Sequence, residues 1–180
     1  VGYRYLLRAL ADGGRSDVIF AMNNQSEKPG YGYQLMKGAT SLTEAWDARR
    51  SSSQNHFMLG QIMEWFYGDL AGIAPDPNAP GFKNVIIKPQ PVGDVTWAEA
   101  SYNSIRGTIR SEWQRQGKEF TLRVTVPPGT MAIALIPAKP DTRVKVLGDG
   151  QEVRMSYQQR SGDRVRVPLP SGTYEVRSEF

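Results

Sequence analysis

The first part of the chain carries apolar residues at helical spacing. In residues 3–11 the apolar side chains return every three or four positions, and Gly13 and Gly14 end the pattern. A second, shorter helix is predicted over residues 17–23 with the Ser16 hydroxyl as its N-cap, and a third over residues 33–37. A longer helix is predicted over residues 56–71, preceded by capping hydroxyls at residues 51–53 and followed by Gly72 at its C-cap.

This longest predicted helix is apolar around nearly its whole circumference. Its apolar side chains are Phe57, Met58, Leu59, Ile62, Met63, Trp65, Phe66 and Leu70. A helix of this kind packs against neighbours on several sides rather than along one stripe. Three or so helices with this much apolar surface do not close a bundle by themselves, so we expect the helical part to be incomplete.

A stiff polar connection with prolines at positions 75, 77 and 80 separates this part from a second one, in which the hydrophobic period is two. Turn signals divide the second part into eight strand-length segments: residues 85–88, 95–100, 105–113, 120–126, 132–136, 143–147, 164–167 and 173–178. Short strands at regular spacing predict an antiparallel, jelly-roll-like β-sandwich. The expected fold class is α+β: an incomplete all-α segment over residues 1–74, a linker over 75–80 and the sandwich over 81–180.

The composition narrows the class of protein. Of the 180 residues, 39% are hydrophobic and 22% are charged, which is typical of a globular protein that buries a core. The chain has no cysteine and a single histidine, so we expect neither a disulfide nor a metal or other cofactor. The apolar runs are short and interrupted, which predicts no membrane-spanning segment. Because the first residue is Val1 and no basic-then-apolar leader follows it, we expect the chain to begin inside a larger protein.

The net charge of +4 is concentrated in the second part of the chain. Residues 81–180 carry fifteen Lys and Arg against ten Asp and Glu, whereas residues 1–80 carry seven against eight. The arginines of the second part alternate with apolar residues along the predicted strands. That alternation is typical of the solvated face of a sheet, so we favour it over a nucleic-acid surface.

The candidate chemistry gathers in residues 44–56. Glycoside hydrolysis needs two carboxyl groups across the scissile bond, and Glu44 is a candidate for one of them, the alternative being a surface glutamate near a turn. Trp46 is suited to stack on a sugar face or to fill the core. Asp47 is suited to accept hydrogen bonds from sugar hydroxyls or to cap the following turn.

An amide and the only imidazole of the chain follow at the start of the longest helix. Asn55 and His56 lie where free backbone N–H groups favour an acceptor, which suits a contact with a sugar hydroxyl. A purely structural histidine is the alternative. Glu64, in the middle of the helix, fits either a salt bridge or a buried acid. Glycine-rich phosphate loops and nucleophile elbows are absent from the sequence.

Taken in order, several motifs resemble those at the end of the catalytic domain of bacterial α-L-rhamnosidases. They are Tyr31-Gly32-Tyr33 and residues 38–47, 51–60, 64–67 and 70–73. Residues 81–89 and 100–107 are similar to the start of the C-terminal β-sandwich of that family. The similarity covers most of the chain up to about Trp113, and the ordered run of motifs is specific although no single motif is.

This resemblance implies an (α/α)₆ barrel that removes terminal α-L-rhamnose with inversion. It implies that Glu44 is the general base and that His56 contacts the rhamnose. Trp46, Asp47 and Asn55, which are candidates from their residue types and positions, are expected to bind the substrate as well. The expected partners are a rhamnose-containing glycoside and the missing N-terminal part of the catalytic domain. The general acid of the family lies upstream of this chain, so the resemblance implies that the isolated chain is inactive.

The sequence departs from the family pattern at two places. Many members carry tryptophan immediately before the base glutamate, where this chain has Thr43, and some carry a long loop at residues 48–50. An alternative of a different class is a non-catalytic carbohydrate-binding or structural sandwich. Its candidate stacking residues are Trp97, Tyr102 and Trp113, although strand spacing assigns at least some of them to the core.

Overall fold

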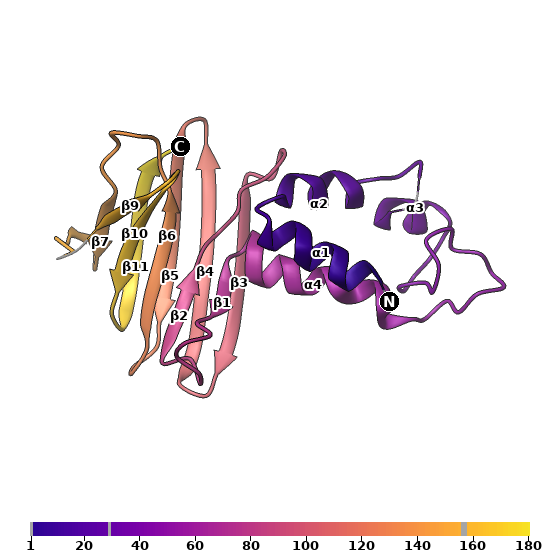
Figure 1. The fold of residues 1–180 in the computed structure, drawn as a ribbon, viewed down its shortest axis with the longest axis horizontal. Coiled ribbons are helices and arrows are strands. Elements are labelled where there is room, and N and C mark those ends of the chain that lie inside the picture. Colours follow the sequence, from indigo (N-terminus) through magenta and orange to yellow (C-terminus); the bar gives the residue numbers. More distant parts are fainter. Residues whose placement is uncertain (1, 29, 156–157) are drawn as a thin grey trace. The chain divides into compact units, whose positions relative to one another are not determined.

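A computed structural model describes residues 2–28, 30–155 and 158–180, and the chain divides into two compact units, Val1–Phe66 and Tyr67–Phe180. The first is helical and the second is built of strands (Figure 1). The predicted fold class, an all-α segment followed by a β-sandwich, is confirmed.

The helices of the first unit are held together by a small apolar core. They are α1 (Gly2–Asp12), α2 (Ser16–Asn23), α3 (Tyr31–Met36), the 3₁₀ helix η1 (Phe57–Gln61) and α4 (Ile62–Trp65). A π-helical turn, η2 (Phe66–Leu70), follows α4 directly. Helix α1 contacts α2, η1 and α4, and Leu7, Ile19, Leu59, Ile62 and Trp65 are buried among them.

Both N-cap predictions are wrong. Arg15, not Ser16, is the N-cap residue of α2, and no side chain caps that helix. Ser16 is instead buried as the first residue of α2, where its Oγ accepts a hydrogen bond of 3.0 Å from the indole Nε1–H of Trp65. The N-cap of η1 is His56, again without a side-chain cap, so the hydroxyls of residues 51–53 do not cap the helix that follows.

The predicted helix over residues 56–71 is present as three consecutive segments of different pitch, η1, α4 and η2. The sequence predicted packing on several sides, but part of the apolar surface of these segments is exposed. Phe57 is 81% exposed and Met63 is 52% exposed, whereas Trp65 is 3% exposed. The reason is that no described element covers the face that carries Phe57 and Met63.

The second unit is a sandwich of two sheets. One has the order β1 (Ile73–Pro75), β2 (Asn84–Ile87), β6 (Met131–Pro137), β10 (Arg164–Leu169), β9 (Gln159–Ser161). The other has the order β3 (Trp97–Ser104), β4 (Gly107–Gln116), β5 (Glu119–Val126), β11 (Gly172–Glu179), β7 (Lys145–Gly148), β8 (Gln151–Glu152). All eight predicted strands are present, together with the short strands β1, β8 and β9 that were not predicted. Every pairing is antiparallel except that of β2 with β6, which is parallel.

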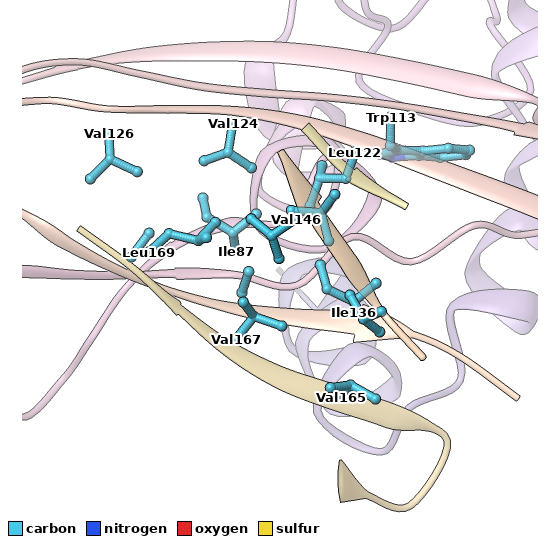
Figure 2. Packing of buried hydrophobic residues seen from close by; sticks show 14 of the residues in the cluster. Ile87, Trp113, Leu122, Val124, Val126, Ile136, Val146, Val165, Val167 and Leu169 are labelled. Atoms are coloured by element: carbon cyan, nitrogen blue, oxygen red, sulfur yellow. The ribbon is translucent and has the colours of Figure 1, made fainter. Parts of the chain in front are cut away.

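Strand alternation directs one face of each sheet into a shared core. On β5, Phe120, Leu122, Val124 and Val126 are buried, while Arg123 between them is exposed. Figure 2 shows side chains of both sheets meeting in this core, Trp113, Leu122, Val124 and Val126 from one and Ile87, Ile136, Val165, Val167 and Leu169 from the other. Such interdigitation supplies the hydrophobic stabilisation of the unit.

The outer face of the six-stranded sheet carries the predicted solvated arginines. Arg123 lies between two glutamates, at 3.4 Å from Glu112 and 3.0 Å from Glu175, on the neighbouring strands. Arg110 is 3.6 Å from Glu99 in the same way. Exposed pairs of this kind contribute little to stability. Arg164, on β10 of the five-stranded sheet, does not follow the prediction of solvated arginines. Its guanidinium is largely buried and donates to the carbonyls of Pro89 and Leu135, and this burial lowers its pKa.

Candidate active site

The candidate residues lie on a loop of the first unit, residues 41–56, whose two ends are joined by backbone hydrogen bonds. The His56 N–H donates to the Leu42 carbonyl at 2.7 Å, and the Glu44 N–H donates to the Ser53 carbonyl at 2.9 Å. These two bonds hold residues 42–44 beside residues 53–56 although neither segment is part of a sheet. The loop tip between them carries Trp46 and Asp47.

The Glu44 carboxylate is exposed and is fixed by the backbone opposite it. Its Oε2 accepts a hydrogen bond of 3.1 Å from the Ser53 N–H. Glu44 and Ser53 therefore exchange two hydrogen bonds, one from each backbone N–H. Among the described residues, Oε1 has no such partner, so one carboxylate oxygen is held and the other faces solvent. This arrangement suits a group that accepts a proton from water.

Trp46 is half-buried in an aromatic cluster that also contains Tyr3 of α1 and Tyr31 of α3. Its ring meets those of Tyr3 and Tyr31 edge-on, with centroid distances of 5.1 and 5.3 Å. The Tyr3 hydroxyl donates to Asn23 at 2.6 Å, and the Tyr31 hydroxyl donates to the Leu59 carbonyl. Burial raises the pKa of both tyrosines above the usual value. Through these contacts the cluster connects the loop tip to α1, α2, α3 and η1.

Trp46 also lines a hollow of about 370 Å³ together with Tyr3, Leu6, Met22 and Asn23. A second, more apolar hollow of about 450 Å³ lies over α2 and α4, where its lining includes Tyr31, Leu42 and Met63. Glu44 lines neither of the two hollows. A sugar bound against Trp46 in the first hollow would meet aromatic and amide groups, which are the usual surroundings of a saccharide.

Asp47 is partnered within the loop. It forms an ion pair with the Arg49 guanidinium, and its Oδ1 accepts the Arg49 backbone N–H at 3.2 Å. The second bond is that of an aspartate capping a turn, which was the alternative considered for this residue. Contact of Asp47 with a substrate stays a prediction.

Asn55 and His56 lie at the other end of the loop. The exposed Asn55 accepts a hydrogen bond of 3.1 Å from the Ser41 hydroxyl through Oδ1. His56 is half-buried in an extended conformation, with its ring stacked on Phe57 at a centroid distance of 6.0 Å. The loop thus brings Glu44, Asn55 and His56 onto adjoining segments and leaves Trp46 and Asp47 at the tip.

Three residues of this site were not singled out as candidates from the sequence: Tyr3, Tyr31 and Gln34. The Oε1 of Gln34 accepts a hydrogen bond of 3.3 Å from the Thr43 N–H of the loop. Tyr31 lay within a motif that supported the family resemblance, whereas Tyr3 and Gln34 gave no signal beyond their helical positions. Among residues 2–28, 30–155 and 158–180, no three His, Cys, Asp or Glu side chains are grouped to hold a metal ion. Within the same ranges, no helix combines the length and apolar character needed to cross a membrane.

Two family models match adjoining parts of the chain. The bacterial alpha-L-rhamnosidase 6 hairpin glycosidase domain matches residues 1–70, and the bacterial alpha-L-rhamnosidase C-terminal domain matches residues 72–151. The chain belongs to the bacterial α-L-rhamnosidase family. It corresponds to the C-terminal part of these proteins, because the match to the glycosidase domain is followed along the chain by the match to the C-terminal domain.

Individual α-L-rhamnosidases show the same relationship. An alpha-L-rhamnosidase of Streptomyces avermitilis is 36% identical over 154 residues, which are 81% of this chain and 15% of the relative. A solved alpha-L-rhamnosidase of Dictyoglumus thermophilum matches 100% of the chain with a TM-score of 0.86 and 29% identity. The Streptomyces avermitilis alpha-L-rhamnosidase solved with L-rhamnose matches 98% of it with a TM-score of 0.85 and 32% identity. The chain spans 21% and 17% of the length of those two structures.

Proposed function

We propose that this chain is the C-terminal part of an inverting α-L-rhamnosidase, in which Glu44 is the general base. In this proposal residues 1–74 supply the last helices of an (α/α)₆ catalytic barrel, residues 75–80 a linker and residues 81–180 a bracing sandwich. The substrate is a glycoside with a terminal α-L-rhamnose. The rest of the catalytic domain supplies the general acid that protonates the leaving group.

The observation that carries the proposal is the state of the Glu44 carboxylate. An inverting enzyme needs a carboxylate that is open to water on one side and fixed in direction, because the water attacks the anomeric carbon from one face only. Glu44 is exposed, and its Oε2 is fixed by the Ser53 N–H at 3.1 Å. The oxygen that faces solvent is then free to accept the proton of the attacking water.

The neighbouring residues have binding roles in this proposal. His56 and Asn55, which share the loop with Glu44, donate to or accept from rhamnose hydroxyls, while Trp46 offers the edge of an aromatic cluster to the sugar. Asp47 orients the loop tip through Arg49 and binds the substrate from there. A relative solved with L-rhamnose supports a saccharide ligand for this family member as well.

The proposal predicts that the chain alone does not hydrolyse rhamnosides. A general base without its partner acid loses leaving-group protonation, which by itself contributes roughly 10²–10⁴-fold to the rate. The longer enzyme of which this chain is a part is therefore the correct test material. Its activity is measured as release of the phenol from an aryl α-L-rhamnoside.

In that enzyme, Glu44→Gln removes the proton acceptor and is expected to lower kcat by about 10²–10⁴-fold. Proton NMR of the first product formed by the unaltered enzyme is expected to show the β-anomer of rhamnose. Glu64→Gln is the matched control, because Glu64 is a half-exposed carboxylate of the same unit that forms long ion pairs with Arg4 and Arg8. Full activity of the Glu44 variant would reject its role, and an α-anomer as first product would reject inversion.

The alternative, a carbohydrate-binding sandwich, finds less support. Trp113 is fully buried, and its indole N–H donates to the Leu70 carbonyl at 2.7 Å, so it cannot stack on a ligand. Trp97 and Tyr102 are exposed on β3, but their odd separation directs them to opposite faces of the sheet. They do not form a common stacking surface.

A further inference from the structure

Gln34 is a buried glutamine that contacts the backbone of the loop just before Glu44. It lies in the last part of α3 and is 3% exposed. Its side-chain Oε1 accepts a hydrogen bond of 3.3 Å from the Thr43 N–H. Because Gln34 belongs to α3 and Thr43 to the loop, this hydrogen bond connects the loop to the helix.

Thr43 is also fully buried, and it supports the backbone on the other side of Glu44. Its Oγ1 donates a hydrogen bond of 2.7 Å to the Ala45 carbonyl. The Thr43 side chain therefore spans the base residue from the position before it to the position after it. Serine and threonine hydroxyls often bond to nearby backbone in this way and so fix tight local conformations.

One backbone group on each of the three consecutive residues 43–45 is fixed by these contacts. The Thr43 N–H is held by Gln34, the Glu44 N–H by the Ser53 carbonyl, and the Ala45 carbonyl by Thr43. We propose that Gln34 and Thr43 are positioning residues that set the direction of the Glu44 carboxylate. This inference rests on the proposed role of Glu44 as general base and extends it to the residues that hold the base in place.

The hydrogen-bonding state of Gln34 supports a specific role. With Oε1 directed at the Thr43 N–H, the Nε2 of Gln34 is buried without an acceptor among the described residues. The reversed amide would place two donors against each other and lose the bond to Thr43. A buried polar side chain with an unsatisfied donor is unfavourable compared with an aliphatic one. Its presence at position 34 indicates that the bond to the Thr43 N–H is what the site requires.

The test uses the longer enzyme with an aryl α-L-rhamnoside that has a good leaving group. Gln34→Met removes the acceptor at similar length, and Thr43→Val removes the hydroxyl at equal size. Each is expected to lower kcat by about tenfold to a hundredfold with KM changed by less than about twofold, because misplacing a catalytic group mainly slows the chemical step. Thr43→Ser, which keeps the hydroxyl, is expected to restore most of kcat.

The decisive measurement combines each variant with Glu44→Gln. Residues that act through Glu44 have no further effect on kcat once its carboxylate is gone, so the double variants should be as slow as Glu44→Gln alone. Gln25→Met is the matched control, since Gln25 is an exposed glutamine of the same unit whose amide donates only to the Ala21 carbonyl.

The outcomes separate this inference from the proposed function. If Glu44→Gln keeps full activity, the base assignment fails, and the positioning role fails with it. If Glu44→Gln is slow while Thr43→Val and Gln34→Met have normal kcat, only the positioning role is overturned. The positioning role is also overturned if kcat of a double variant falls by the product of the two single-variant losses, so that Thr43→Val or Gln34→Met slows the enzyme further in the Glu44→Gln background. Should Gln34→Met not fold, Thr43→Val and Thr43→Ser decide the matter alone.

Discussion

Replacing Gly72 with alanine would drive a methyl group into the backbone of residues 88 and 89. Gly72 has a φ of +81°, and an ideal Cβ built on it would lie 2.3 Å from the Pro89 nitrogen and 2.4 Å from the Lys88 carbonyl carbon. Non-bonded carbon atoms prefer separations of about 3.5–4.0 Å. The contact involves backbone atoms on both sides, so no side-chain rotation relieves it.

The expected loss of stability has three contributions. The left-handed conformation costs alanine roughly 1–2 kcal/mol, and forced repacking of a filled site typically costs about 1–3 kcal/mol. Any shift that separates the strands also weakens the hydrogen bond of 2.8 Å from the Lys88 N–H to the Gly72 carbonyl, which contributes about 1 kcal/mol. We therefore expect Gly72→Ala to lower the free energy of unfolding by about 3–6 kcal/mol.

The matched control is Gly117→Ala in the turn between β4 and β5. Gly117 also has a positive φ, +59°, but a Cβ there would meet nothing within 4 Å. It should therefore lose only the conformational contribution, about 1–2 kcal/mol. Urea denaturation followed by circular dichroism gives both values, and hydrogen exchange of β2 localises the effect. Equal losses in the two variants, within about 0.5 kcal/mol, would refute the steric reasoning.

Two further predictions concern buried aromatic groups. Trp113→Ala should lower the free energy of unfolding by about 3–5 kcal/mol because Trp113 is fully buried in the sandwich core. Trp97→Ala should change it by less than about 0.5 kcal/mol, since Trp97 is 65% exposed; comparable urea midpoints for the two variants would contradict this contrast. Burial raises the pKa of Tyr31, with a further contribution from Tyr3, so the folded state holds this proton more tightly than the unfolded state. The contribution of Tyr31 to the free energy of unfolding is fully present below about pH 10 and is lost as the pH rises above it. The free energy of unfolding of Tyr31→Phe should therefore decrease less steeply with pH in that range. Denaturation midpoints measured from pH 8 to pH 12 test it, and identical slopes for the two proteins would count against it.

The strands that could be predicted are those in which one face is buried. Residues 120–126 alternate between apolar and polar positions, and β5 covers Glu119–Val126 with the predicted face in the core. The exposed strands β8 (Gln151–Glu152) and β9 (Gln159–Ser161) have no such alternation. They are strands because β7 and β10 lie beside them, which is a property of the tertiary structure.

The pairing of the strands is a second feature that the hydrophobic pattern does not specify. Alternation indicates which side chains point inward, but it is the same for parallel and antiparallel neighbours. The parallel pairing of β2 with β6 joins segments more than forty residues apart, with Val85 opposite Ala132. The helical region shows a similar limit. The apolar side chains of residues 56–71 predicted a helix there, but they did not predict that it would consist of a 3₁₀ segment, an α segment and a π turn.

The same distinction between local and distant contacts applies to the candidate site. Asp47 contacts Arg49 two positions away, so the turn-capping alternative could be stated from residue types and spacing alone. The contact of Gln34 with Thr43 depends on where α3 lies beside the loop, and Ser53 contacts Glu44 through its backbone N–H and carbonyl, which its residue type does not specify. A motif can therefore indicate which side chain is the candidate base, because its type is chemically required. The groups that hold this side chain in place are brought to it by the fold. They can therefore be identified only from the three-dimensional structure of the loop.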